Sequence, residues 1–278
     1  MNHIELQIKC GPEYSEILMA EVSMIGFDTI EENQDGFNAY ILEGDFNEEL
    51  LGEVLSKYQD FIEDHSSKVV EKQNWNAEWE QNYDPIVIEN KCIVKATFHQ
   101  IDESYSFEIT INPKMSFGTG HHETTYQILN ILMDFDCHNK LVMDAGCGTG
   151  VLAIMAKLRG ARHVEAFDID DWCIENSQEN FDLNDCSNCH VQLGTLGQLK
   201  FEEEFDLVIA NINKNVLLNE MHLYADNLKT NGDLILSGFY TQDVEELKVK
   251  AAEHNLSFLY QTDKKNWAAA VFRKLPTT

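Results

Sequence analysis

One short segment, Leu141–Ile154, constrains the fold of this chain more than any other. It reads LVMDAGCGTGVLAI: an apolar strand-like run, three glycines at alternate positions, and apolar residues with helical spacing. Gly146 and Gly148 permit a tight turn and close approach of a ligand, and the helix N-terminus offers free N–H groups to an anion. About twenty residues further on, a second strand-like run ends in Asp168, whose carboxylate suits ribose hydroxyls. The segment predicts a nucleoside-binding strand–turn–helix unit.

The spacing of these glycines narrows the choice of ligand. Dinucleotide-binding folds use Gly-x-Gly-x-x-Gly, whereas the third glycine here is Gly150 and Val151 follows it. With Asp144 before it, the pattern is similar to the first motif of methyltransferases that use S-adenosylmethionine (SAM), a ligand with a carboxylate and a ribose but no phosphate. SAM is therefore the expected methyl donor. An ordinary strand-to-helix turn is the alternative interpretation.

The balance of acidic and basic residues indicates which kinds of macromolecule the chain can bind. The chain has 278 residues, enough for a large and a small domain, and its 48 acidic and 20 basic residues give a formal charge of −28. Unless a local basic patch exists, such a chain repels DNA and RNA, and it attracts a basic protein. We therefore expect no direct binding to nucleic acid. Solubility or a saline habitat would explain the charge as well.

The N-terminus and the cysteines predict the compartment. Residues 1–9 contain neither a basic leader nor an apolar signal core, and no apolar run approaches membrane-spanning length. The seven cysteines are an odd number scattered over strand-like and helix-like segments, which fits reduced thiols better than a disulfide framework. We expect a cytoplasmic monomer that does not engage a membrane.

One cysteine pattern, Cys186–His190, matches the spacing of c-type haem attachment. Haem attachment requires export, for which the sequence shows no signal. A zinc site would need two more ligands, for which Cys137 and His138 are the plausible donors. A loop between a helix and a strand is the simplest interpretation, and no metal is expected.

Residues 1–62 predict a small α+β domain. The first residues alternate between apolar and polar, as a strand does, and Pro12 opens a helical pattern. Two strand-like runs follow, Phe27–Glu31 and Phe37–Leu42, and residues 46–62 again have helical spacing. This order is typical of a ferredoxin-like domain. We expect the domain to recognise the substrate, because it contains none of the cofactor motifs.

A polar, charged stretch without periodicity, Glu63–Lys72, is the expected linker. Trp75 and Trp79 follow it with i,i+4 spacing, which suits a helix that anchors on the next domain, and a ligand stack is the alternative. We therefore expect a linker and anchoring helix over residues 63–80 and a methyltransferase domain over 81–278.

From residue 81 the pattern is that of an α/β domain. Two strand-like runs, Ile86–Phe98 and Tyr105–Ile111, predict a hairpin at its start. Strand-like runs then alternate with helical runs between the first six of them, as a mainly parallel sheet with helices on both faces requires. The strand-like runs are Leu141–Asp144, His163–Asp168, His190–Gly194, Phe205–Ala210, Asp233–Gly238, Ser257–Thr262 and Trp267–Arg273. The last two are too close for a crossover helix, which predicts a Rossmann-like seven-stranded sheet with one reversed strand.

A second dense cluster, Asn112–Thr125, places glycines and two histidines directly before a helix, as in a loop that folds over a ligand. His121 and His122 could act as metal ligands or bases, but neighbouring side chains diverge and no carboxylate stands at metal spacing on one helix face. Thr124 and Thr125 are expected to supply hydroxyls that face the cofactor.

The fourth strand of the predicted sheet ends at Asn211, where polar residues abruptly follow an apolar run. The transferred methyl group should lie here, and the side-chain carbonyl of Asn211 could hold an acceptor amine. Asn211 is therefore the expected catalytic residue. Its alternative role is to cap a helix that begins near Val216.

Four segments together carry a resemblance to one family: Phe117–Thr125, Asp144–Gly150, Asp168–Asp170 and Asn211–Ile212. Over nearly its whole length the chain resembles the ribosomal protein L-eleven methyltransferases, the PrmA family. The resemblance implies methylation of the N-terminal amine and of lysine side chains of a basic ribosomal protein. It also implies that SAM is bound through Thr125, Gly146, Asp168 and Asn211.

Three positions near the acceptor entrance depart from the family pattern. Asn112 and Lys114 stand where an acid and a glycine are usual, and Lys214 stands where a small residue is usual. Two other kinds of function fit the same cofactor motifs: a small-molecule or RNA methyltransferase, and a non-catalytic nucleoside-binding module. The negative charge disfavours RNA, and the separate small domain favours a macromolecular substrate.

Overall fold

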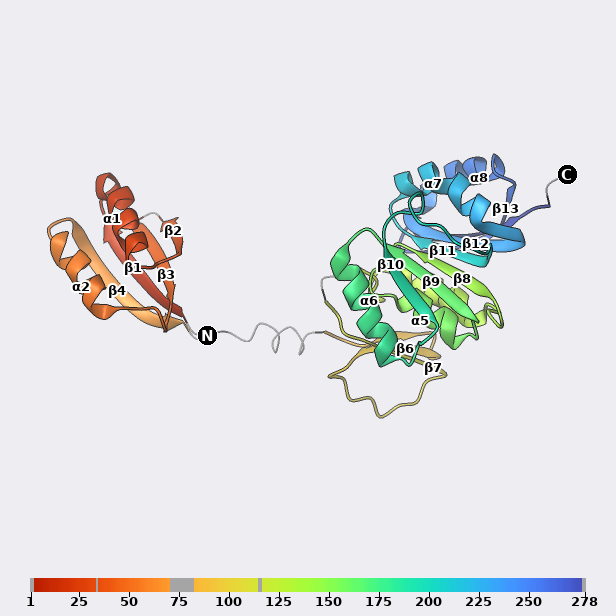
Figure 1. The fold of residues 1–278 in the computed structure, drawn as a ribbon, viewed down its shortest axis with the longest axis horizontal. Helices are drawn as coiled ribbons and strands as arrows, with labels where there is room; N and C mark the ends of the chain where they lie inside the picture. The colour runs from red at the N-terminus through yellow and green to blue at the C-terminus, as the bar shows by residue number, and fades with distance from the viewer. Residues whose placement is uncertain (1–2, 34, 71–82, 115–116, 277–278) are drawn as a thin grey trace. The chain divides into compact units, whose positions relative to one another are not determined.

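The computed structural model describes residues 3–33, 35–70, 83–114 and 117–276. The chain divides into two compact units, Met1–Asn82 and Tyr83–Thr278 (Figure 1). Each unit has its own hydrophobic core. The predicted fold class, a Rossmann-like α/β domain with a small α+β unit before it, is confirmed.

The small unit is a four-stranded antiparallel sheet with two helices packed on one face. The strand order is β2-β3-β1-β4, the ferredoxin-like arrangement. Alternate residues of the two central strands form the core together with apolar positions of both helices. In chain order the elements are β1 (His3–Cys10), α1 (Pro12–Met24), β2 (Thr29–Asn33), β3 (Gly36–Leu42), α2 (Glu48–Lys57) and β4 (Ile62–Val70).

The fourth strand corrects the prediction for the end of this unit. β4 pairs with β1 along its length, so the small domain does not end at residue 62, and the linker predicted over 63–72 is wrong as far as Val70. The side chains of residues 63–69 are all exposed. An edge strand needs only backbone hydrogen bonds to one neighbour, so this one lacks the apolar alternation by which strands are recognised. Trp75 and Trp79 lie outside the described residues.

The large unit begins with a three-stranded sheet of β5 (Ile86–Ile88), β6 (Cys92–Ala96) and β7 (Phe107–Ile111). The hairpin predicted between two long strands is wrong. The first run instead turns back on itself between β5 and β6, because Glu89 and Asn90 adopt positive φ (48° and 54°), as a type I′ turn requires. β7 then pairs parallel to β6.

The main sheet has seven strands in the order β10-β9-β8-β11-β12-β14-β13. Neighbouring strands are parallel except that β14 is antiparallel to both β12 and β13. The predicted sheet with one reversed strand is thus confirmed. Its strands are β8 (Leu141–Ala145), β9 (His163–Asp168), β10 (Cys189–Leu193), β11 (Phe205–Asn211), β12 (Leu228–Tyr240), β13 (Leu256–Lys264) and β14 (Trp267–Lys274).

Helices cover both faces of this sheet (Figure 1). One face packs on α4 (Glu123–Asp134), α5 (Val151–Leu158) and α6 (Asp171–Leu183), and the other on α7 (Lys214–Asn227) and α8 (Val244–Ala252), which follows the short helix η1 (Thr241–Asp243). Successive strand residues alternate between the two cores, as Val142 and Met143 do. Within the described part of the chain, no helix has the length and apolar character needed to cross a membrane.

The connection from β10 to β11 differs from the prediction of helices between the first six strands. Residues 194–204 contain no helix. Gly194 and Gly197 both disfavour one. Leu199 and Phe201 pack against the core under α7, so a loop takes the place of a helix on this part of the sheet.

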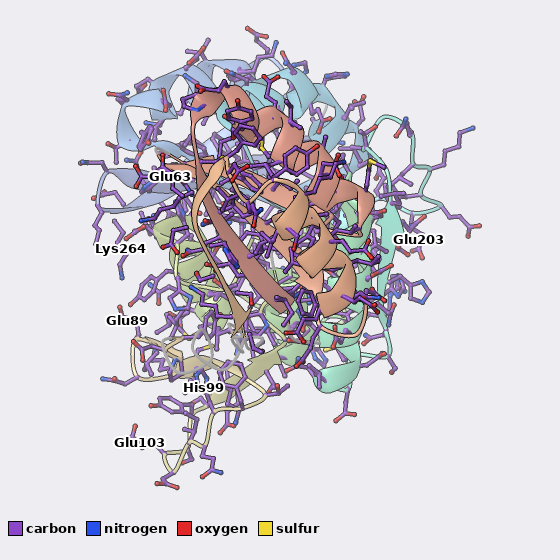
Figure 2. The ribbon with its side chains drawn as sticks, turned by 90° about the vertical axis from the view of Figure 1, so that its left-hand side faces the viewer. Glu63, Glu89, His99, Glu103, Glu203 and Lys264 are labelled. Atoms are coloured by element: carbon purple, nitrogen blue, oxygen red, sulfur yellow. The ribbon has the colours of Figure 1, made fainter. Side chains whose placement is uncertain are left out.

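Acidic side chains project from several parts of the large unit. Figure 2 shows Glu89, Glu103 and Glu203 pointing outward, and all three are exposed. These side chains contribute negative charge to the surface of the large unit.

Candidate cofactor and acceptor site

A cavity of about 630 Å³ opens at the carboxyl ends of β8, β9 and β11. The strand order reverses here, because β9 lies on one side of β8 and β11 on the other, and parallel sheets bind ligands at such switch points. Gly146, Gly148, Asp168 and Asn211 all line this cavity. The structure thus brings together these four predicted site residues.

The glycine turn is needed for close packing within the chain as well as for access of a ligand. Gly146, Gly148 and Gly150 have φ angles of 69°, 55° and 76°, a region that other residues rarely adopt. A Cβ on Gly148 would lie 2.2 Å from the carbonyl oxygen of Phe117. That oxygen accepts the N–H of Thr149 at 2.9 Å. The loop before α4 therefore rests directly on the turn, and Gly148 is required for that contact.

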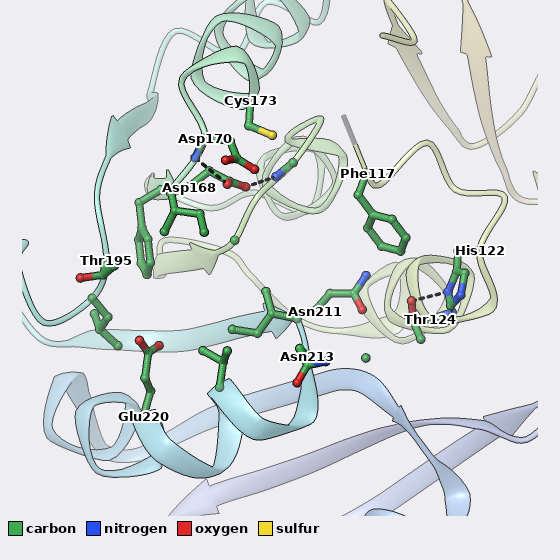
Figure 3. A pocket seen from close by; sticks show the side chains of 18 of the residues that line it. Phe117, His122, Thr124, Asp168, Asp170, Cys173, Thr195, Asn211, Asn213 and Glu220 are labelled. Atoms are coloured by element: carbon green, nitrogen blue, oxygen red, sulfur yellow. Dashed lines mark hydrogen bonds between the residues drawn. The ribbon is translucent and has the colours of Figure 1, made fainter. Parts of the chain in front are cut away.

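Asp168 ends β9 with its carboxylate held by backbone N–H groups. Oδ2 accepts from Gly148 at 2.9 Å, and Oδ1 accepts from Asp170 at 3.2 Å (Figure 3). Each oxygen keeps a second lone pair, which suits the two hydroxyls of a ribose. One ligand atom from each of Asp168, Asp170 and Cys173 lies within 4.8 Å of the others, so this side of the cavity could also hold a cation.

Asn211 has a buried amide oxygen that no described residue hydrogen-bonds. Its Nδ2 donates to Thr125 Oγ1 at 3.1 Å, while Oδ1 accepts no hydrogen bond within the described part of the chain. A buried acceptor left unpaired costs free energy, so this oxygen is suited to receive an N–H from a bound molecule. The alternative capping role for Asn211 is wrong, because Asn213 caps α7 by accepting the N–H of Asn215 at 2.9 Å.

At the start of α4, His122 and Thr124 line the cavity, whereas Thr125 is buried next to it. His122 is the N-cap, with Nδ1 accepting from the Thr124 N–H at 3.3 Å and lying 2.8 Å from Thr124 Oγ1 (Figure 3). His122 and Thr124 line the cavity, as the prediction for Thr124 requires. Thr125 is fully buried, is not a lining residue and contacts Asn211 instead.

Ile212, the residue after Asn211, is wedged between two glycines. A Cβ on Gly146 would lie 2.3 Å from Cγ2 of Ile212, and a Cβ on Gly238 would lie 2.0 Å from its carbonyl oxygen. Both contacts fix the backbone beside Asn211. Gly238 was not among the predicted site residues, although a glycine at the end of an apolar strand is itself a sign of close backbone approach.

An aromatic wall that sequence reasoning missed lines the far side of the cavity. The rings of Phe117 and His122 have centroids 5.3 Å apart, and those of His122 and Trp267 are 4.6 Å apart. Tyr240 continues the row, 4.2 Å from Trp267. Trp267 opens β14, and its role depends on the strand order that places β14 beside β12. A single tryptophan at a strand start carries no local signal of that placement.

A second carboxyl group is buried beneath the glycine turn. Asp144 is fully buried, with Oδ2 accepting from the Ala153 N–H at 3.0 Å and Oδ1 without a partner among the described residues. Loss of hydration on burial raises the pKa of Asp144 to about 7, and the neighbouring Asp168 charge adds to the rise.

The departures from the family pattern form local contacts outside the cavity. Asn112 donates to Glu179 of α6 at 2.8 Å, and Lys114 forms an ion pair with the same carboxylate. Lys214 pairs with Asp243 at 2.9 Å and with Glu246 at 3.1 Å. These bonds tie neighbouring segments together, and none of the three residues lines the cavity.

Comparison with known proteins places this chain in one family. The family model "Ribosomal protein L11 methyltransferase (PrmA)" matches residues 13–275. The ribosomal protein L11 methyltransferase of Phocaeicola vulgatus is 42% identical over 266 residues, 95% of each chain. That of Porphyromonas gingivalis is 41% identical over 263 residues, 92% of this chain and 90% of its own.

A solved structure shares the fold. The crystal structure of ribosomal protein L11 methylase from Lactobacillus delbrueckii subsp. bulgaricus superposes with a TM-score of 0.64 at 24% identity, covering 70% of this chain and 100% of that one. With the family model matched over nearly the whole sequence, the chain belongs to the ribosomal protein L11 methyltransferase family.

Proposed function

We propose that this chain transfers a methyl group from SAM to amino groups of ribosomal protein L11. Its relatives are named for that activity, and its cavity combines a carboxylate suited to ribose with an acceptor for an amine. The observation that carries the proposal is the buried, unpartnered Oδ1 of Asn211, which lines the same cavity as Asp168.

The residues present fit SAM. Asp168 would hold the ribose hydroxyls, and its apolar neighbours Phe167 and Ile169 line the cavity where a base can pack. Gly146 and Gly148 have positive φ and carry no side chains, so the turn leaves room for the rest of the SAM molecule to approach. When bound, SAM supplies a methyl group on a positively charged sulfur.

Asn211 would position the attacking amine. An amine that donates one N–H to Oδ1 has its direction fixed, so that its lone pair can point at the methyl carbon. A lysine must first become neutral, which costs roughly 4 kcal/mol near pH 7.4 for an unperturbed pKa of about 10.4. Transfer into the cavity removes water from the ammonium and lowers this cost. The ammonium would give its proton to water as it enters the cavity, so no side chain need act as a general base.

The finer proposal is that the amines are lysine side chains and the N-terminal amine, and that the small unit recognises the substrate. The four-stranded sheet forms its own core and contains none of the cavity residues. The acidic chain would attract a basic ribosomal protein, with affinity that weakens as salt increases.

Intact-mass spectrometry tests the function. Purified enzyme, SAM and ribosomal protein L11 should give product with added mass in steps of one methyl group, with peptide mapping to assign the amines. A matched reaction with ribosomal RNA or with small amines should give none. Methylation of RNA, or release of S-adenosylhomocysteine only with a small amine, would contradict the proposal.

The role of the small unit has its own test. A chain starting at Tyr83, the first residue of the large unit, should still bind SAM but lose methylation of L11 by more than tenfold. The cut lies after β4, so it does not divide the small sheet. Full activity of the shortened enzyme on intact L11 would refute recognition by the small unit. Loss of SAM binding would show that the unit serves stability instead.

A further inference from the structure

A second cluster of potential metal ligands lies on β9 and β10, outside the cavity. His163 and Glu165 are two residues apart on β9, so their side chains share one face, and His190 is the register partner of Glu165 on β10. One ligand atom from each of the three residues lies within 4.8 Å of the others. His163 Nε2 and Glu165 Oε1 are 2.6 Å apart, and the rings of His163 and His190 have centroids 5.0 Å apart.

This cluster occupies a face of the sheet that a helix would ordinarily cover. The intervening β9 residues Val164 and Ala166 point into the core under α5, so His163 and Glu165 point to the opposite face. The connection that follows β10, residues 194–204, has no helix to lie over them. His163 and Glu165 keep 27% and 19% of their side chains exposed, and His190 is exposed. Water and ions therefore reach all three.

The wider motif around His190 does not explain the cluster. Cys186 and Cys189 are buried, and Cys189 starts β10 while Cys186 lies in the connection from α6, as the prediction of a helix-to-strand loop requires. Among the described residues, neither thiol joins a group of three potential ligands, and Cys137 and His138 do not either. The cluster therefore forms from the facing positions of two strands and not from the cysteine spacing.

We propose that His163, Glu165 and His190 form a binding site for a divalent transition-metal ion of the zinc type, with water completing the coordination. Two imidazoles and one carboxylate are a ligand set that such ions prefer, and three protein ligands leave a position open. The ligands stand on adjacent, hydrogen-bonded strands, so small side-chain rotations can bring them to the bonding distance of about 2.0–2.2 Å.

A neighbouring hydrogen bond orients the Glu165 carboxylate for metal binding. Gln192, two residues after His190 on β10, donates from Nε2 to Glu165 Oε2 at 3.0 Å. This bond occupies one carboxylate oxygen and leaves Oε1 facing His163. Hydrogen bonds of this kind orient metal ligands and typically affect affinity by about 10- to 100-fold. A bound ion would also join the edge strand β10 to β9, whose carboxyl end carries Asp168.

Calorimetric titration of the full chain with zinc chloride tests the site. After treatment with a chelator and dialysis, the protein should bind one equivalent of zinc. His190→Asn and Glu165→Gln should each weaken that binding by more than about 100-fold, and Gln192→Ala, which removes the hydrogen bond to Glu165, should weaken it by about tenfold. His138→Asn, at an exposed histidine outside both clusters, is the matched control and should bind as the parent does.

The electronic spectrum of the cobalt-substituted protein identifies the ligands. Nitrogen and oxygen ligation should give no thiolate-to-cobalt charge-transfer band, and Cys173→Ser, in the cluster of the cavity, should leave zinc affinity unchanged. Absence of saturable zinc binding would overturn the proposal. So would equal affinity in the parent, His190→Asn and Glu165→Gln proteins, or a thiolate band, each of which would place the ion elsewhere.

Discussion

The two halves of the cavity are built on different principles. In Figure 3, Asp168 and Asp170 lie on one side and Phe117, His122 and Thr124 on the other, with Asn211 between them. The half proposed to hold the cofactor, here called the cofactor half, comes from a short stretch of chain, residues 144–173, whose backbone N–H groups already hold the Asp168 carboxylate. The half proposed to hold the amine, here called the acceptor half, is assembled from side chains of distant segments.

The two halves therefore differ in how far their polar groups are held in place before a ligand binds. The Asp168 carboxylate keeps its orientation through backbone N–H groups, so ordering it on cofactor binding costs little. Asn211 Oδ1 has no partner, so its hydrogen bond becomes available only to the molecule that enters. Substitutions in the first half should therefore act on stability and cofactor affinity, and those in the second on turnover.

The largest effect is expected from Asp144, under the cofactor half. Because burial raises its pKa to about 7 from 3.8, the native state holds a proton that the unfolded state has lost between those pH values. This group's contribution to stability therefore falls as pH rises from about 4 to about 7, by on the order of 4 kcal/mol. Asp144→Asn, which stays neutral, should gain stability relative to the parent over this range. Urea unfolding at several pH values measures the difference, and a constant difference would contradict it.

Asp168→Ala should weaken SAM binding by roughly 1.5–3 kcal/mol, about 10- to 150-fold in Kd, the scale of hydrogen bonds to a charged group. Isothermal titration calorimetry measures the affinity, with circular dichroism to confirm the fold. Asp171→Ala, at the exposed neighbouring acid in the first turn of α6, is the control and should bind normally. An unchanged Kd in Asp168→Ala would exclude contact with the ribose.

Asn211→Ala should lower kcat by more than tenfold, with a smaller change in SAM affinity, because it removes the oxygen that orients the amine. Asn213→Ala is a matched comparison in the same cavity, since its oxygen caps α7. It should cost about 1 kcal/mol of stability and have little effect on kcat. Equal losses of rate and SAM affinity in Asn211→Ala would show that Asn211 serves cofactor binding alone.

The smallest effect is expected at Thr125, which acts through Asn211. Thr125→Val removes the hydroxyl that accepts from Asn211 Nδ2 and should lower kcat several-fold, while Thr125→Ser, which keeps it, should restore most of the rate. SAM affinity should not change, because Thr125 does not line the cavity. A matching loss of SAM affinity would instead support the direct cofactor contact that the family resemblance implies.

The same comparison explains how much the sequence could predict. The cofactor half was predictable because its geometry depends on spacing within one strand–turn–helix unit, from Gly146 to Asp168. The other half was predicted only in part: at Asn211, where a strand ends abruptly, and at Thr124, at the start of a helix that follows a glycine-rich loop. Trp267 and Gly238 reach the cavity through the order of β12 and β14, which no local pattern encodes.

Errors in the fold have a related cause. β4 was taken for a linker because its side chains are exposed and only its backbone pairs with β1. The β5–β6 turn depends on two non-glycine residues with positive φ, Glu89 and Asn90, which a search for glycine turns overlooks. The seven-stranded sheet was predictable because its five inner strands, β9, β8, β11, β12 and β14, are buried and apolar over most of their length.

The place of β14 has a consequence for the synthesis of the enzyme. β14 is made after β12 and β13 yet lies between them, so β13 has no neighbour in the sheet until β14 leaves the ribosome. The same strand begins with Trp267 of the aromatic wall. The residues proposed to hold the nucleoside all precede β14 in the chain, so a nascent protein would form that side of the cavity first and complete the aromatic wall when β14 inserts.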